Sequence, residues 1–151
     1  MSQDARHLPP LIRPAKVTDY DEILRVWSAA GLSYRPGQRD SQEGFRRQVE
    51  RFGDCYLVAT DRGRVVGVIL GTHDERKGWI NRLAVLPEYR RRAVASALLK
   101  ACESAIHSRG IEIITALVEE SNTESYSFFQ KMGYVCDLPV HYLRKLSHPE
   151  A

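Results

Sequence analysis

The residues of this chain best suited to chemistry lie at a strand-to-helix junction, residues 81–99. An apolar run ends just before Pro87, and basic and small residues then open a helical pattern. The first turn of a helix has unpaired backbone N–H groups and the positive end of its dipole, which together bind anions. Arg90, Arg91 and Arg92 add attraction for a polyanion. A solvated arginine cluster is the alternative, but basic residues do not stabilise this end of a helix, which favours a phosphate site.

Composition places the chain among ordinary globular proteins. Its 151 residues suit one domain, and a net charge of +3 is too small to indicate nucleic-acid binding by itself. Cys55, Cys102 and Cys136 lack metal-site spacing and are typical of thiols in a reducing compartment. No start resembling a signal peptide and no apolar run of membrane length occurs. We therefore expect a cytoplasmic protein that uses no metal and contacts no membrane.

The first third of the chain is predicted to be mainly helical. Residues 1–9 are expected to form a loose tail and residues 11–14 a short strand. Thr18 is the expected N-cap of a first helix that ends at Gly31, and a second helix is expected over residues 41–52.

The remainder predicts a sheet with one parallel crossover. Strands are expected at residues 55–60, 64–72, 78–86, 111–118, 134–137 and 140–146. The first three of these form an antiparallel meander. A helix over residues 91–108 then connects to the next strand, and Asn122 caps a helix that Gly133 ends. We expect a single α/β domain over residues 1–151, with its core in residues 11–146.

Two motifs in this order resemble the GNAT superfamily of acetyl-CoA-dependent N-acetyltransferases. Residues 83–95, LAVLPEYRRRAVA, are similar to the family's acyl-CoA signature Gln/Arg-x-x-Gly-x-Gly/Ala with its preceding strand end. Residues 122–134, NTESYSFFQKMGY, are similar to the family's Asn-x-x-Ala-x-x-Leu-Tyr-x-Lys-x-Gly-Phe. The resemblance implies an α/β (α+β) fold with a mixed, mostly antiparallel sheet of about six or seven strands. That sheet splays between its fourth and fifth strands and carries helices on both faces.

The resemblance also implies where acetyl-CoA binds. Backbone groups of the strand end meet the pantetheine arm, the following amides and arginines hold the pyrophosphate, and the last helix borders the thioester. The implied residues are Leu83, Ala84, Val85, Arg90, Arg91, Arg92, Ala93, Val94, Ala95, Ser96, Asn122, Ser125 and Phe129. Taken without the resemblance, Asn122 is also a good helix cap and Phe129 an ordinary core residue.

Three positions depart from the family's pattern. The signature glycine is Ala93, whose methyl group narrows the approach to phosphate and costs more at positive φ. The tyrosine that commonly protonates the leaving thiolate is Phe129, so Tyr126 or water is the candidate donor, although Tyr126 also suits the surface. The position of a general base in several relatives is Asn81, which takes up no proton at neutral pH.

A substitute base is therefore expected elsewhere. The candidates are His73, Asp74, Glu75, Glu119 and Glu120. Glu119 is favoured because the carboxyl ends of strands in a crossover sheet face the ligand cleft, and the alternative is an exposed loop carboxylate.

The implied reaction is attack of an amine on the thioester within a ternary complex, with the N–H of Val85 or Leu86 stabilising the oxyanion. The acceptor is expected to be a primary amine of a small molecule or protein, entering near Tyr34 and Arg35. Nearby carboxylates at positions 119 and 120 favour a cationic acceptor. A longer acyl group than acetyl remains open, as does a monomer against a homodimer.

Two other functions compete with this interpretation. The three departures are compatible with a catalytically weak acyl-CoA-binding or regulatory domain. A nucleic-acid module would combine the arginines at 90–92 with Arg46, Arg47 and Arg51, but the chain lacks a nucleic-acid motif or an aromatic row for bases, so no nucleic-acid partner is expected.

Overall fold

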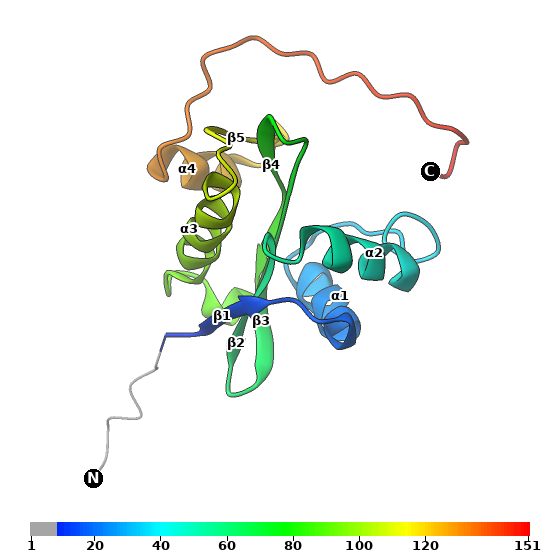
Figure 1. Ribbon diagram of the computed structural model, residues 1–151, viewed down its shortest axis with the longest axis vertical. Coiled ribbons are helices and arrows are strands. Elements are labelled where there is room, and N and C mark those ends of the chain that lie inside the picture. Colours follow the sequence, from blue (N-terminus) through cyan, green and yellow to red (C-terminus); the bar gives the residue numbers. More distant parts are fainter. Residues whose placement is uncertain (1–8) are drawn as a thin grey trace.

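A five-stranded sheet in the order β1-β2-β3-β4-β5 organises the chain, and the computed structural model describes residues 9–151 of it (Figure 1). The expected tail, residues 1–9, falls almost wholly outside the described residues. The strands are β1 Leu11–Pro14, β2 Tyr56–Asp61, β3 Arg64–His73, β4 Lys77–Val85 and β5 Ile113–Ala116. The helices are α1 Tyr20–Ala29, α2 Gln42–Phe52, α3 Val94–His107 and α4 Thr123–Lys131, with short 3-10 turns η1 Val17–Asp19 and η2 Pro87–Tyr89.

The sheet is mixed, as expected. Each of β1 to β3 pairs antiparallel with the next strand, and β4 pairs parallel with β5. Helices α1 and α2 lie on one side of the sheet and α3 and α4 on the other (Figure 1). The fold class, the meander and the parallel crossover are thus confirmed. Among residues 9–151 no helix is both long and apolar enough to cross a membrane.

Helix α3 packs very close to the sheet because glycines face it. A Cβ at Gly71 would collide with the Cys102 sulfur, and one at Gly78 would lie 2.7 Å from Ile106. The buried side chains of α3, such as Leu98 and Leu99, complete the core on this face. This close packing sets the start of α3 directly beyond the end of β4, where the expected phosphate site lies.

The expectation of six or seven strands is wrong, since the described chain has five. Residues 134–137 and 140–146 form no strand, and the chain leaves the body after Tyr134 (Figure 1). Alternating apolar residues make a strand only where a neighbouring strand supplies hydrogen bonds, and here none lies beside them. Val135 and Leu143 are accordingly 78% and 88% exposed.

The start of the first helix also differs from the expectation. Thr18 lies inside η1 and caps nothing, and α1 begins at Tyr20. Asp19 organises this entry: its carboxylate accepts from the Lys16 amide at 2.7 Å and pairs with Arg13 at 2.7 Å. Burial opposes ionisation of Asp19, but these two hydrogen bonds hold its pKa below the ordinary value.

Candidate active site

A cleft of about 760 Å³ opens where β4 and β5 part. The last β4–β5 pair joins Ile80 to Ala116, whereas β4 continues along β3 as far as Val85. The end of β4 therefore has a strand on one side only. An extended ligand that carries amides can lie along such an open edge as an added strand does.

A β-bulge in β4 accompanies the opening. Opposite β3, Leu70 pairs with Arg82 but Gly71 pairs with Ile80, which leaves Asn81 as the extra residue. A bulge bends its strand and increases the local twist. The bend lies directly after the last residue that β5 holds, so we attribute the parting of the strands to it.

The register decides which backbone groups of β4 face the cleft. Leu86 donates to the Val66 carbonyl at 2.9 Å, and the residues of an antiparallel pair alternate in the side to which they bond. Leu86 and Ala84 therefore direct their backbone groups to β3, and Leu83 and Val85 direct theirs to the open side. Of the two amides expected for the oxyanion, that of Leu86 is already used and that of Val85 is available.

The turn before α3 presents a row of unpaired amides. Arg91 and Ala93 both have positive φ, 63° and 58°, and α3 starts at Val94. Within the described chain, no backbone carbonyl accepts from the amides of residues 91–96. Left-handed residues that alternate with right-handed ones turn successive N–H groups towards one point, and the helix dipole adds positive potential there. This arrangement suits a diphosphate.

The three arginines divide between two environments. Arg90 and Arg91 line the cleft. The Arg92 guanidinium instead stacks on the ring of Tyr89, 5.1 Å from its centroid, and does not line the cleft. Tyr89 is itself held by a hydrogen bond from its hydroxyl to Asp61 at 2.5 Å. The structure thus places two of the three guanidinium groups beside the amides.

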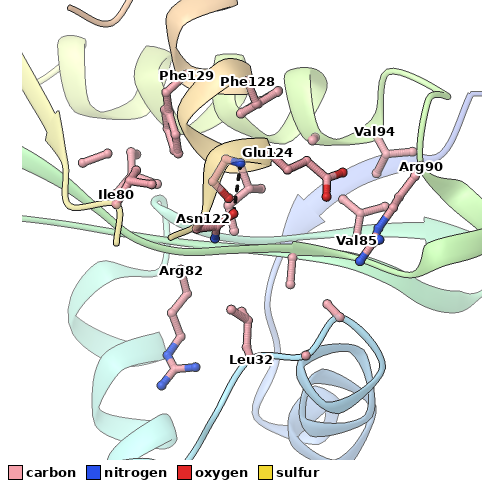
Figure 2. Close-up of a pocket in the computed structure, with 18 of the residues that line it drawn as sticks. Leu32, Ile80, Arg82, Val85, Arg90, Val94, Asn122, Glu124, Phe128 and Phe129 are labelled. Atoms are coloured by element: carbon pink, nitrogen blue, oxygen red, sulfur yellow. Dashed lines mark hydrogen bonds between the residues drawn. The ribbon is translucent and has the colours of Figure 1, made fainter. Parts of the chain in front are cut away.

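Helix α4 forms the opposite wall of the cleft (Figure 2). The Asn122 side chain accepts from the Ser125 amide at 3.1 Å and so caps the helix. One turn further, the Phe129 ring packs between Phe128 and Tyr134, with centroids 5.3 and 5.0 Å away. The wall is therefore polar at the helix start and aromatic beyond it.

Nearly all of the expected cofactor-binding residues meet in this one cleft. Those that line it are Leu83, Ala84, Val85, Arg90, Arg91, Ala93, Val94, Ala95, Ser96, Asn122, Ser125 and Phe129. Arg92 is the exception. The lining residues come from β4, from the start of α3 and from α4. These elements are separated in the sequence, so the fold brings the residues together.

The expected catalytic residues are only partly assembled. Asn81 and Glu119 line the cleft, and the Asn81 amide nitrogen donates to the Thr72 hydroxyl at 2.7 Å. Tyr126 does not line the cleft and is 43% exposed, because it lies on the outward side of α4. The structure therefore brings a carboxylate to the cleft but no phenol in the place of Phe129.

The other candidate bases lie elsewhere. His73, Asp74, Glu75 and Glu120 do not line the cleft. His73 ends β3, where its ring meets Phe52 edge to face, and Asp74 and Glu75 follow in the turn to β4. No three His, Cys, Asp or Glu side chains of residues 9–151 gather where a metal ion could be held.

The side of the cleft where we expect an acceptor to enter contains residues that sequence reasoning missed. Leu32 and Ser33 line it, whereas the expected Tyr34 and Arg35 do not. Arg82 also lines it and donates to the Ser33 carbonyl at 3.0 Å, which ties this loop to β4. In the sequence, the only sign that Arg82 belongs to the site is its position directly before Leu83, where the strand motif begins.

Glu124 is a further residue that sequence reasoning missed. It lines the cleft from the first turn of α4, and its side chain extends towards Arg90 (Figure 2). In the sequence it occupies a variable position of the second motif, so the pattern itself carried no signal.

Comparisons with known proteins agree with this geometry. A family model described as "Acetyltransferase (GNAT) family" matches residues 20–134. The acetyltransferase SG1711 of Sodalis glossinidius (strain morsitans) is 32% identical over 123 residues, covering 82% of this chain and 85% of the relative. Among solved structures, Ard1 from Thermoplasma volcanium has a TM-score of 0.76 at 24% identity, covering 87% of this chain and 86% of Ard1. The PaiA N-acetyltransferase from Thermoplasma acidophilum, in complex with coenzyme A, has a TM-score of 0.72 at 22% identity, covering 83% and 89%.

Proposed function

Because the chain belongs to the GNAT family of acetyltransferases, we propose that it transfers an acetyl group from acetyl-CoA to a primary amine. The observation that carries the proposal is the row of free amides at residues 91–96, placed at the wide end of the opening between β4 and β5. A phosphate site and an open strand edge in line are what a diphosphate joined to an amide-bearing arm requires.

Each part of the cleft would hold one part of the co-substrate. Arg90, Arg91 and the start of α3 would bind the diphosphate. The backbone groups of Leu83 and Val85 that face the open side would bond the pantetheine amides. The thioester would then lie near Asn122 and the bulge at residue 81, within reach of an amine entering past the loop at residues 32–33. The structural neighbour PaiA holds coenzyme A, which supports this use of the fold.

The proposed reaction depends more on positioning and on a backbone amide than on catalytic side chains. The amine nitrogen attacks the thioester carbonyl carbon, the C–S bond breaks, the amine gives up a proton to a base, and the leaving thiolate takes up a proton. Holding the two reactants in line can supply roughly 7–11 kcal/mol of the barrier. The Val85 amide would stabilise the oxyanion, and Glu119 would accept the amine proton directly or through a water. With Phe129 where a phenol would serve, water would protonate the thiolate, whose ordinary pKa of about 8.5 makes it a fair leaving group.

The acceptor is proposed to be a cationic amine of a small molecule or a protein. Glu119 places a carboxylate in the cleft lining. An ammonium group is attracted there before it loses its proton and reacts.

A second candidate function is an acyl-CoA-binding domain with little turnover. The specific observation in its favour is the aromatic wall at Phe129 together with the outward position of Tyr126. Both candidates bind acetyl-CoA, and only the first couples binding to transfer.

Calorimetry with acetyl-CoA followed by an amine panel tests both. Because Cys136 is an exposed thiol, released CoA is best measured by chromatography rather than by a thiol reagent. We expect micromolar to submillimolar binding and CoA release that depends on an amine. Binding without release across polyamines, amino acids and peptides would favour the second function, and no binding at millimolar acetyl-CoA would refute both.

A further inference from the structure

Glu124 faces the proposed diphosphate site from across the cleft. It is the second residue of α4 and lines the same cleft as Arg90 and the first residues of α3. Figure 2 shows its carboxylate directed towards Arg90 and Val94, with no hydrogen bond drawn from it to the other residues shown. A negative side chain thus extends into the space between the two walls.

This position is unusual for a carboxylate. The start of α3 and the two arginines give one wall a positive potential, which attracts Glu124 when nothing else is bound. A diphosphate that binds to the same wall carries the same sign of charge as Glu124. The side chain must then turn away or remain close to a like charge, and either outcome weakens binding.

Resting on the proposed function, we infer that Glu124 is a built-in competitor of the diphosphate, which lowers the affinity for acyl-CoA and speeds the release of CoA. In this role Glu124 sets the affinity for CoA and takes no part in the reaction. It is exposed and can move, so we expect a moderate effect.

A charge series at this position provides the test. CoA binding is measured by calorimetry at about 50 mM and 500 mM salt for the wild type, Glu124→Gln and Glu124→Lys. Removing the charge is expected to tighten binding about 3- to 10-fold at low salt, and reversing it to tighten binding further. Both gains are expected to shrink at high salt, where exposed charges are screened beyond about 5 Å.

Glu120→Gln is the matched control. It removes the same charge from an exposed glutamate four positions earlier that does not line the cleft. We expect its CoA affinity to stay within about 2-fold of the wild type, since only distant, screened interactions change.

The outcomes separate this inference from the proposed function. If the wild type and all variants ignore CoA, the proposed function fails. If the wild type binds CoA and Glu124→Gln binds equally or more weakly, the inference is overturned. A purely structural role cannot imitate the expected result, because an acidic residue in the first turn stabilises α4 and its loss would weaken binding.

Discussion

The Arg82 guanidinium stacks on the indole of Trp27, 4.3 Å from the ring centroid. This contact joins β4, one residue after its bulge, to the inner side of α1. The same guanidinium pairs with Asp40 at 3.4 Å, on the loop that leads to α2. One side chain therefore connects the strand that would bind the co-substrate to α1 and to the loop before α2.

Arg82→Met is expected to lower the free energy of unfolding by about 1–3 kcal/mol, because it leaves the largely buried Asp40 without this partner and removes the stacking. Urea unfolding followed by circular dichroism measures the change. Arg39→Met is the control, since Arg39 reaches the same carboxylate at 3.8 Å but is half exposed, and it should cost less than about 0.5 kcal/mol. Equal losses in the two variants would contradict the role given to Arg82.

Ala93→Gly is expected to stabilise the protein by up to about 1 kcal/mol, although glycine normally destabilises a fold by raising the conformational entropy of the unfolded chain. Ala93 has a φ of 58°, where a Cβ is strained by roughly 1–2 kcal/mol, more than glycine loses through unfolded-state entropy. Ala95→Gly, inside α3, should instead destabilise by about 0.5–1 kcal/mol. The two midpoints of urea unfolding should therefore move in opposite directions, and a parallel shift would rule out strain at residue 93.

Phe129→Tyr is expected to raise kcat on an accepted amine by about 10-fold or more, because it places a phenol on the cleft wall where, in the proposed reaction, the thiolate would leave. Tyr126→Phe should leave kcat within about 2-fold, since that phenol points away from the cleft. Initial rates of CoA release decide the matter. A large loss in Tyr126→Phe would show that this side chain reaches the thioester after all.

Asp19→Asn is expected to lose about 1–3 kcal/mol of stability at pH 7, because Arg13 then loses its paired carboxylate. The folded pKa of Asp19 lies below its ordinary value of 3.8, so its contribution is complete above that value and is lost as the pH falls through the folded pKa. The stability difference between the wild type and the variant should stay constant from pH 7 to about 5 and vanish in stronger acid. A difference that grows on acidification would contradict the assignment.

Amides of residues 136–146 are expected to exchange with solvent as fast as those of an unfolded peptide, because this segment lies outside the sheet. Amides of β3, which is paired on both sides, should be the most protected. Hydrogen exchange read by mass spectrometry distinguishes the two regions within minutes. Protection of residues 136–146 would indicate that they pair with the free edge of β5.

Signals within a few residues of the chain predicted much of this molecule. The strand end before Pro87, Arg90 and Arg91 after it and the Asn122 cap are local features, and the structure places them in one cleft. The parallel crossover followed from the order of apolar patterns, because a strand, a helix and a strand have few ways to pack.

What failed depended on which partner each residue contacts in the fold, and residue patterns do not reveal that. The sequence could not show whether residues 134–137 and 140–146 form strands or an unpaired extended segment, since apolar and polar residues alternate in the same way in both. The η1 turn replaced the Thr18 cap because Asp19 found Arg13 and the Lys16 amide. The direction of Arg82 depends on the bulge at Asn81, which no local pattern marks.

The extra residue Asn81 also changes which residues of β4 face each side of the sheet. In an uninterrupted β4, Arg82 would share a face with Gly78 and Ile80, and its charge would point at the apolar side of α3. With Asn81 inserted, the odd-numbered residues after it take over that face and Arg82 turns to Trp27. If Asn81 instead took a regular place in the ladder opposite Leu70, the rest of the strand would be inverted and the Arg82 cation would enter the protein interior.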